Sequence, residues 1–337
     1  MFKFEIIENG SEKWKEIINQ AAVYDFHHTS YFHKIDTAFT SKLLFFSDGD
    51  HFIALPIVIR PIQDTAFFDV TSVYGYAGPV HKFGESYDPV ELLLFFKTNF
   101  VAFCKEHNIV SVFSRLHPLI DQKTILEGLG EIVDLNKTVS IDLKKSAEEQ
   151  RKEYRKSLKS ELNQLGRKEI YVKEADSQEE TDQFISIYYE TMDRVHAASN
   201  YYFSKEYFYE FLNNPDFKSK LLIAVKNEKV IAGAIFTLTE KIMQYHLAGT
   251  TEEFIPETPM KLILNEARLL GNETTAEDLH LGGGVGGQDD DSLFRFKSAF
   301  SKNFKQFSVW KFIVDQEIYD ELSKDKTHPS FFPLYRS

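Results

Sequence analysis

The stretch that decides the fold runs from Leu281 to Phe300 and reads LGGGVGGQDDDSLFRFKSAF. Five of the six residues at 282–287 are glycine, which buries no side chain and loses much backbone freedom on ordering, so a loop is predicted here. The alternating residues at 278–281 predict a strand before the loop. Apolar residues from Leu293 to Phe300 recur at helical spacing and predict a helix after it. A strand, a glycine loop and a helix in this order bring the backbone close to a ligand.

Three consecutive aspartates at 289–291 follow the glycines. Aspartate accepts hydrogen bonds from the free N–H groups of a helix start and complements its positive end, so we expect these residues to cap the helix. Gly282, Gly284 and Gly287 satisfy the letters of a dinucleotide fingerprint, but three carboxylates beside them would repel a pyrophosphate. A contiguous acidic triplet without further ligands also predicts no metal site. A glycine-rich connection that holds no ligand is the alternative.

Length and composition set wider bounds. A chain of 337 residues, 43% of them hydrophobic, can bury a large core, and its length favours two domains. The net charge of −12 argues against a DNA-binding protein, although a local basic patch is compatible with it. The single cysteine, Cys104, cannot form an intramolecular disulfide and is expected to be a small core residue.

The start of the chain and its apolar runs bear on location. Residues 1–5 alternate like a strand and do not read as a secretory signal. No run approaches the roughly 20 apolar residues of a membrane span. The sequence therefore predicts a cytoplasmic protein without a transmembrane segment, which is compatible with association with the inner membrane face.

The order of predicted elements occurs twice along the chain: a strand, helices, an antiparallel hairpin, a helix and a strand. The first hairpin turns at Ser47–Asp50 and the second at Lys226–Lys229. A single charged helix is expected at 146–165. We therefore predict an α/β (α+β) fold of two tandem domains, 1–145 and 146–337, each with a mixed sheet flanked by helices.

This order of elements resembles the GNAT acyltransferase fold. The motifs resemble those of the Fem (FemAB-like) family of peptidoglycan-bridge aminoacyltransferases and related envelope-polysaccharide acyltransferases. They are, in chain order, Tyr74–Pro79 (YGYAGP), Tyr154–Lys159 (YRKSLK), Tyr188–Arg194 (YYETMDR), Ile231–Ala234 (IAGA), Tyr245–Gly249 (YHLAG), Leu281–Gly284 (LGGG) and Phe296–Lys297 before Phe300. The resemblance spans nearly the whole chain and implies two tandem GNAT-like domains. The long coiled-coil arm of some members has no counterpart here, because no heptad run of that length is present.

The resemblance implies a catalytic role for Lys297, which matches the lysine of the family's Phe-Lys motif. That lysine contacts the acyl donor or stabilises charge that develops on the carbonyl. The alternative, from its phenylalanine neighbours alone, is a lysine whose aliphatic chain packs along those rings and has no further role. Gly283, Gly284 and Arg295 are expected to contact the donor, Arg295 at a phosphate.

A basic face is predicted on the helix at 146–165, where Arg151, Arg155 and Lys159 recur every fourth residue. In an acidic chain this local reversal of charge predicts a clamp for the phosphates of a nucleotide-sugar, a lipid diphosphate, coenzyme A or a tRNA end. An ordinary solvated helix face is the alternative.

A polar segment at 193–203 joins two predicted helices and is a candidate substrate-binding loop. Arg194 is expected to bind a phosphate or carboxylate, with Tyr201 and Tyr202 as further substrate contacts. His196 is a candidate base for the attacking amine, because imidazole titrates near neutral pH. An exposed histidine without a role is the alternative.

The GNAT pattern also places the acyl donor along the strand at 242–248 and its phosphates at the start of the following helix. Tyr245, Gly249 and Lys261 are therefore expected to bind the donor, and His246 is a second candidate base. The coenzyme A signature of GNAT enzymes is missing, since Glu257-Thr258-Pro259 occupies its place. The donor is thus either an aminoacyl-tRNA or an acyl-coenzyme A that is held in another way.

In the first half, Lys34, Tyr74 and Tyr76 are expected, by analogy with the family, to face the acceptor in a cleft between the domains. The alternative for the two tyrosines is core packing at the end of a strand.

The sequence thus predicts an N-acyltransferase that moves an aminoacyl or acyl group to an amine of a cell-envelope precursor. The acceptor would be a peptidoglycan stem peptide or an amino sugar, carried on a nucleotide or a lipid. No Ser-His-Asp or Cys-His pattern is visible, so direct transfer without a covalent enzyme intermediate or a tightly bound cofactor is expected. The alternatives are an acyl-coenzyme A-dependent N-acetyltransferase of an amino sugar or small amine, and a non-catalytic binding protein.

Overall fold

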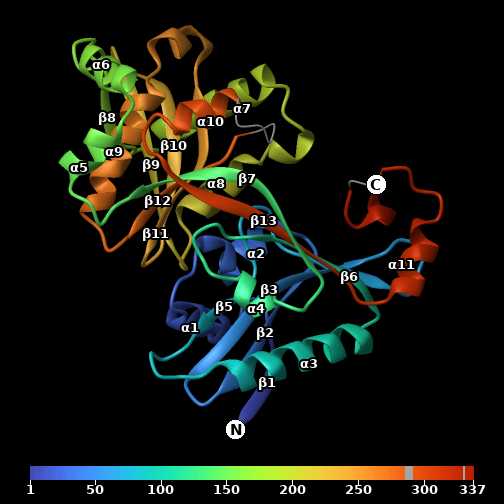
Figure 1. Ribbon diagram of the computed structural model, residues 1–337. Helices are drawn as coiled ribbons and strands as arrows, with labels where there is room; N and C mark the ends of the chain where they lie inside the picture. Colours follow the sequence, from blue (N-terminus) through green and yellow to red (C-terminus); the bar gives the residue numbers. More distant parts are fainter. Residues whose placement is uncertain (285–290, 329–330) are drawn as a thin grey trace. The chain divides into compact units, whose positions relative to one another are not determined.

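The computed structural model describes residues 1–284, 291–328 and 331–337, and the chain divides into two compact units. Unit 1 comprises residues 1–136 and 306–337, and unit 2 comprises residues 137–305. Each unit has a mixed β-sheet flanked by helices (Figure 1). The predicted α/β (α+β) fold class, with two domains that each have a mixed sheet flanked by helices, is therefore confirmed.

The observed division differs from the predicted boundary at 145/146. The chain passes from unit 1 to unit 2 within β7 (Glu131–Asp142) and returns within β13 (Asn303–Ile313). The return occurs because β13 pairs antiparallel with β6 (Ile109–Leu116), and Trp310 of β13 is fully buried in the core of unit 1. Sequence order alone gives no sign of a pairing between segments so far apart.

Unit 1 is built on the sheet order β1-β2-β3-β4-β6-β13, with β5 paired to β3. Its elements beyond those already given are β1 (Phe2–Glu8), α1 (Glu12–Gln20), α2 (Ser30–Asp36), β2 (Thr40–Asp48), β3 (His51–Pro61), β4 (Phe68–Thr71), β5 (Val80–Lys82), α3 (Val90–Glu106), α4 (Lys123–Leu126) and α11 (Gln316–Ser323). The predicted first hairpin is confirmed, because Asp48 pairs with His51 across a two-residue turn. Helix α3 covers one face of the sheet and buries Phe96, Phe100 and the predicted core residue Cys104.

Unit 2 is built on the sheet order β7-β12-β11-β10-β9-β8. Its further elements are α5 (Ala147–Glu153), α6 (Lys156–Leu165), β8 (Tyr171–Glu174), α7 (Gln178–Arg194), α8 (Lys205–Leu212), β9 (Lys218–Lys226), β10 (Lys229–Leu238), β11 (Ile242–Thr250), α9 (Met260–Asn272), β12 (Asp278–Gly282) and α10 (Ser292–Lys297). Strand β12 runs parallel to β11 and antiparallel to β7, and the remaining neighbours are antiparallel.

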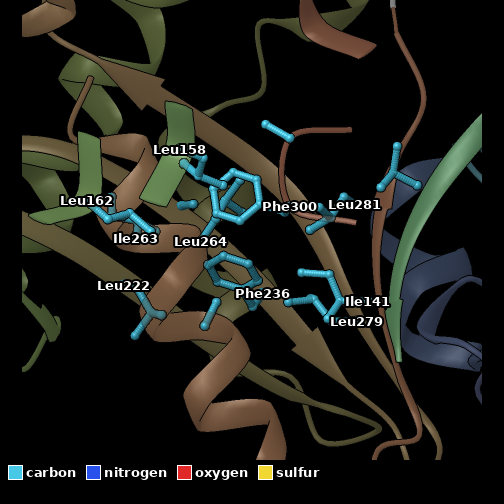
Figure 2. Close-up of a cluster of buried hydrophobic side chains, with 14 of the residues drawn as sticks. Ile141, Leu158, Leu162, Leu222, Phe236, Ile263, Leu264, Leu279, Leu281 and Phe300 are labelled. Atoms are coloured by element: carbon cyan, nitrogen blue, oxygen red, sulfur yellow. The ribbon is translucent and has the colours of Figure 1, made fainter. Parts of the chain in front are cut away.

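The two faces of this sheet are covered by different helices. On one face, Leu158 of α6 and Leu264 of α9 point toward Phe236 and Leu279 of the sheet (Figure 2). On the other face, Gly233 leaves room for the ring of Phe184 on α7, because a Cβ there would lie 2.5 Å from that ring. Alternate residues of β10 and β11 therefore face different helices.

One predicted helix is wrong. The segment 146–165 forms two helices, α5 and α6, which are separated at Tyr154 and Arg155 by extended ψ angles of 142° and 141°. The break turns the Tyr154 ring into the core of unit 2, where its hydroxyl is 3.3 Å from the Asn265 amide oxygen. The Arg155 N–H donates to the Ala299 carbonyl at 2.8 Å. Burial of one aromatic ring thus outweighs the continuity of the charged helix.

None of the helices in the described ranges combines the length and hydrophobicity that crossing a membrane requires.

Candidate functional site

Lys297 lies at the end of α10 and is buried, with 6% of its surface exposed. Asp291 caps this helix by accepting a hydrogen bond from the Phe294 N–H at 2.9 Å, which confirms the predicted capping role for that aspartate. The Lys297 ammonium donates to the carbonyl of Gly283 at 2.8 Å, just beyond the end of β12. The predicted lysine therefore meets the predicted glycine backbone.

Burial lowers the pKa of Lys297 to about 7, against the opposing effect of the nearby Asp291 carboxylate. An amine with this pKa is present in comparable amounts as free amine and as ammonium near neutral pH. Such a group can accept a proton and return it, which an ordinary lysine with a pKa near 10.4 does poorly at this pH.

Tyr245 of β11 forms a second wall around this amine. Its ring centroid lies 5.6 Å from the Lys297 Nζ, a distance at which the ring face attracts a cation. Burial raises the pKa of Tyr245 well above its usual range, so its phenol stays protonated and can donate a hydrogen bond. The structure thus brings together Lys297, Gly283 and Tyr245 from α10, the end of β12 and β11.

The backbone close to Lys297 favours glycine at two positions, Gly282 and Gly284. Gly282 has a φ of 75°, which glycine adopts without strain. A Cβ on Gly284 would lie 2.2 Å from the Asp291 carboxylate oxygen. The glycines at 286–287 and the aspartates at 289–290, to which the sequence assigned roles, lie outside the described residues.

The guanidinium of Arg194, at the end of α7, forms no ion pair with any of the described residues. Its Nη2 donates to the Thr191 hydroxyl at 3.3 Å. Its Nη1 is buried and has no hydrogen-bond partner in the described part of the chain. A buried guanidinium nitrogen without an acceptor is costly, so this position is suited to an anionic ligand.

The neighbours of Arg194 in the predicted substrate loop are placed at the surface. His196 is exposed and has a left-handed backbone, with a φ of 50°. Tyr202 is 41% exposed and donates to Asp193 at 2.8 Å, while the Tyr201 carbonyl accepts from the Tyr188 hydroxyl at 2.8 Å.

Three predicted donor-binding or catalytic residues contact neighbouring groups of unit 2: two through packing and one through an ion pair. The ring of His246 stacks on Phe211 of α8 at 4.7 Å, on the face of the sheet opposite to that of Tyr245. The ammonium of Lys261 forms an ion pair with Glu161 at 2.7 Å. Gly249 lies against α7, where a Cβ would be 2.9 Å from the Ile187 carbonyl oxygen.

Gly249→Ala is accordingly expected to destabilise unit 2 by about 1–3 kcal/mol, because the added methyl group would press on helix backbone that cannot move aside. Thermal unfolding of this variant measures the effect. Gly166→Ala is the matched control, since a Cβ there would lie 3.7 Å from its nearest neighbour. Equal melting temperatures for the two variants would contradict the packing role of Gly249.

The predicted basic face is not continuous, because Arg151 and Lys159 belong to different helices. Arg151 donates to the Asn163 side chain at 2.9 Å, and Lys159 donates to the Lys152 carbonyl at 2.8 Å. Arg155, at the break, lies 3.4 Å from the carbonyl of the exposed Arg295. Two of these cations therefore tie α5 to α6, and the prediction that all three share one helix face is wrong.

In unit 1, the predicted acceptor-binding residues lie at or near the surface. Lys34 is exposed on α2, 5.3 Å above the Tyr31 ring. Tyr74 is 46% exposed, and Arg115 lies 5.2 Å from its ring. Tyr76 is half-buried.

A buried polar network next to Tyr76 was not predicted from the sequence. The Asp25 carboxylate oxygen Oδ2 is 3.0 Å from His27 Nδ1 and 3.1 Å from His117 Nε2, and all three residues are buried. A Cβ on Gly75, between the two tyrosines, would lie 2.1 Å from the His27 ring. The run DFHH at 25–28 was the one available signal, and His117 is too distant in sequence to be connected with it.

Comparison with known proteins supports the fold. No protein-family model and no curated protein sequence matches the chain. Among solved structures, FemX superposes with a TM-score of 0.73 at 11% identity, over 94% of this chain and 99% of its own. L-PGS from Bacillus licheniformis gives 0.62 at 13% identity, over 98% and 97%. The C-terminal domain of a putative lysylphosphatidylglycerol synthetase from Agrobacterium fabrum gives 0.58 at 14% identity, over 91% and 92%. The chain thus has the fold of FemX, and the predicted FemAB-like resemblance is confirmed at the level of the fold.

Proposed function

We propose that this protein is an N-acyltransferase that moves an aminoacyl or acyl group to an amine of a cell-envelope precursor. The observation that carries the proposal is the buried Lys297 amine, with its pKa lowered to about 7, held between the Gly283 carbonyl and the Tyr245 ring. The solved structures that share its fold include FemX and the C-terminal domain of a putative lysylphosphatidylglycerol synthetase, which supports this proposal.

The proposed reaction needs one proton acceptor and no covalent enzyme intermediate. The acceptor nitrogen forms a C–N bond with the donor carbonyl carbon, and the C–O bond of an ester or the C–S bond of a thioester breaks. The free amine of Lys297 takes the proton that the attacking nitrogen loses and returns it to the leaving oxygen or sulfur. Lys297 thus takes the role of base, for which the sequence offered His196 and His246 as candidates.

Tyr245 is proposed to assist at the carbonyl oxygen. Because its phenol stays protonated, it can donate a hydrogen bond to negative charge that develops there. His246 points to the other face of the sheet, so we do not assign it the base.

Arg194 is proposed to bind a phosphate or carboxylate group of the acceptor or the donor. Arg194→Ala is expected to raise the KM for that substrate about 10- to 100-fold, because a hydrogen bond to a charged group contributes about 1.5–3 kcal/mol. Steady-state kinetics of this variant, compared with the exposed control Arg167→Ala, measures the effect. An unchanged KM in Arg194→Ala would remove the anion-binding role.

The donor and the acceptor are open between defined classes. Aminoacyl-tRNA and acyl-coenzyme A are the proposed donors, and a nucleotide- or lipid-linked peptide stem or amino sugar is the proposed acceptor. Such precursors are met in the cytoplasm and at the inner membrane face, where the protein is proposed to act.

A binding panel tests the proposal and separates the donors. Native mass spectrometry of co-purifying ligands is followed by thermal shifts with acetyl-coenzyme A, charged tRNA and nucleotide-linked amino sugars. Stabilisation by charged tRNA would indicate aminoacyl transfer, and stabilisation by acetyl-coenzyme A would indicate N-acetylation. Binding of an envelope precursor without transfer from either donor would favour the non-catalytic alternative.

A further inference from the structure

A fully buried histidine, His280, lies on β12 below the site. Its Nδ1 is 2.6 Å from the Gln244 side-chain oxygen on β11, and its Nε2 is 2.8 Å from the Thr138 hydroxyl on β7. One imidazole thus joins three adjacent strands of the unit 2 sheet.

The direction of these hydrogen bonds follows from the partner amide. The Gln244 nitrogen Nε2 donates to the Tyr245 carbonyl at 3.2 Å, so the Gln244 oxygen is the end that faces His280. An amide oxygen only accepts, and His280 Nδ1 must therefore carry the proton. In the neutral ring, Nε2 is then the acceptor for the Thr138 hydroxyl.

Each partner of His280 adjoins a component of the Lys297 site. Gln244 immediately precedes Tyr245, and His280 precedes Gly283 by three residues. Thr138 lies beneath Gly283, where a Cβ would be 3.8 Å from the threonine methyl and 3.2 Å from the Lys137 carbonyl.

We propose that His280 is a positioning residue that fixes the Gly283 carbonyl and the Tyr245 ring against the Lys297 amine. The importance of His280 for catalysis rests on the proposed function. The groups that face the amine are the Gly283 carbonyl from the end of β12, Tyr245 from β11 and the Asp291 carboxylate from α10. If the hydrogen bonds of His280 to β11 and β7 are lost, we expect water to reach the Lys297 ammonium and to raise its pKa.

The test reads Lys297 directly and needs no substrate. Competitive labelling of Lys297 with acetic anhydride between pH 5 and 11, followed by peptide mass spectrometry, gives the pKa of its amine in the full chain. His280→Phe, which removes both hydrogen bonds, is expected to raise this pKa by about one unit, so that labelling at pH 7 falls about fivefold. His280→Asn, whose amide nitrogen can replace Nδ1 toward Gln244, is expected to restore part of the low value.

Two further variants keep the inference falsifiable. Thr138→Val removes one hydroxyl, conserves volume and is expected to shift labelling in the same direction if His280→Phe does not fold. Asn272→Leu is the control, because Asn272 donates to the Leu143 and Lys145 carbonyls away from Lys297. A Lys297 pKa that stays constant in His280→Phe and Thr138→Val, or that shifts equally in Asn272→Leu, would overturn the inference.

The outcome is separate from that of the proposed function. A shifted Lys297 pKa in a protein that transfers no acyl group would remove the proposed function and leave the positioning role of His280. Transfer that persists with an unshifted pKa would do the reverse.

Discussion

Lys297→Met is expected to slow acyl transfer about 10²- to 10⁴-fold at pH 8, because the variant lacks the group that accepts the proton of the attacking amine. Methionine fills a similar volume without a charge to bury, so the melting temperature is expected to stay the same or to rise. Initial rates at saturating donor, together with thermal unfolding, separate loss of chemistry from loss of fold.

The pH dependence of the wild-type rate follows from the same group. The pKa of Lys297 is lowered to about 7, so the reactive free amine predominates above this pH and is titrated away below it. The rate is therefore expected to level off above pH 8 and to fall about tenfold per unit well below pH 7. Lys297→Arg keeps a cation but cannot lose its proton, and is expected to be as slow as Lys297→Met. Wild-type activity in Lys297→Arg would show that Lys297 acts only through its charge.

The second large effect is expected in unit 1 below neutral pH. Burial lowers the pKa of His28 and that of His33 to about 3, and both side chains are shielded from solvent. In the unfolded chain, these histidines take up protons near pH 6.5, whereas in the folded unit they stay neutral. The contribution of each histidine to the free energy of unfolding is therefore fully present above pH 6.5. It declines by about 1.4 kcal/mol per pH unit as pH falls toward 3.

The Asp25 carboxylate adds to this acid sensitivity at still lower pH. Its burial raises its pKa, but hydrogen bonds from His117 and His27 outweigh that effect and hold the pKa well below the usual range. The stability that Asp25 contributes is present above its unfolded pKa of about 3.9 and is lost as pH falls below it.

Urea unfolding of the protein between pH 7 and 4 measures this loss. His33→Leu, which removes an imidazole packed 5.1 Å from the Trp14 ring, is expected to reduce the dependence by about 1.4 kcal/mol per pH unit. His196→Ala is the control, because that histidine is exposed. An equal pH dependence in the wild type and His33→Leu would contradict burial of His33 in its neutral form.

Periodicity and turn chemistry were sufficient to predict most long elements. The hairpin of β2 and β3 turns within Ser47–Asp50, as predicted, and helices α7 and α8 lie on either side of the polar segment at 193–203. The prediction of a lysine next to glycine backbone is also met, since Lys297 donates to Gly283. These features depend on residues close in sequence or on a motif that resembles a known family.

Features that depend on distant pairing were not predictable. The break between α5 and α6 is set by the burial of Tyr154 against residues of α9, more than 100 positions away. The return of β13 to unit 1 is set by its pairing with β6. The His280 and Asp25 networks each join histidine to partners from separate strands or loops, and no local sequence pattern predicts such contacts.

Acyl transfer is tested most directly by the mass of an amine acceptor after incubation with the protein and each donor in turn, charged tRNA or acyl-coenzyme A. We expect one donor to add one aminoacyl or acyl mass to the acceptor amine with the wild-type chain, and Lys297→Met to form no product on the same timescale. Equal product formation by the wild type and Lys297→Met would contradict the central role of Lys297. Absence of transfer to any envelope precursor from either donor would contradict the acyltransferase assignment itself.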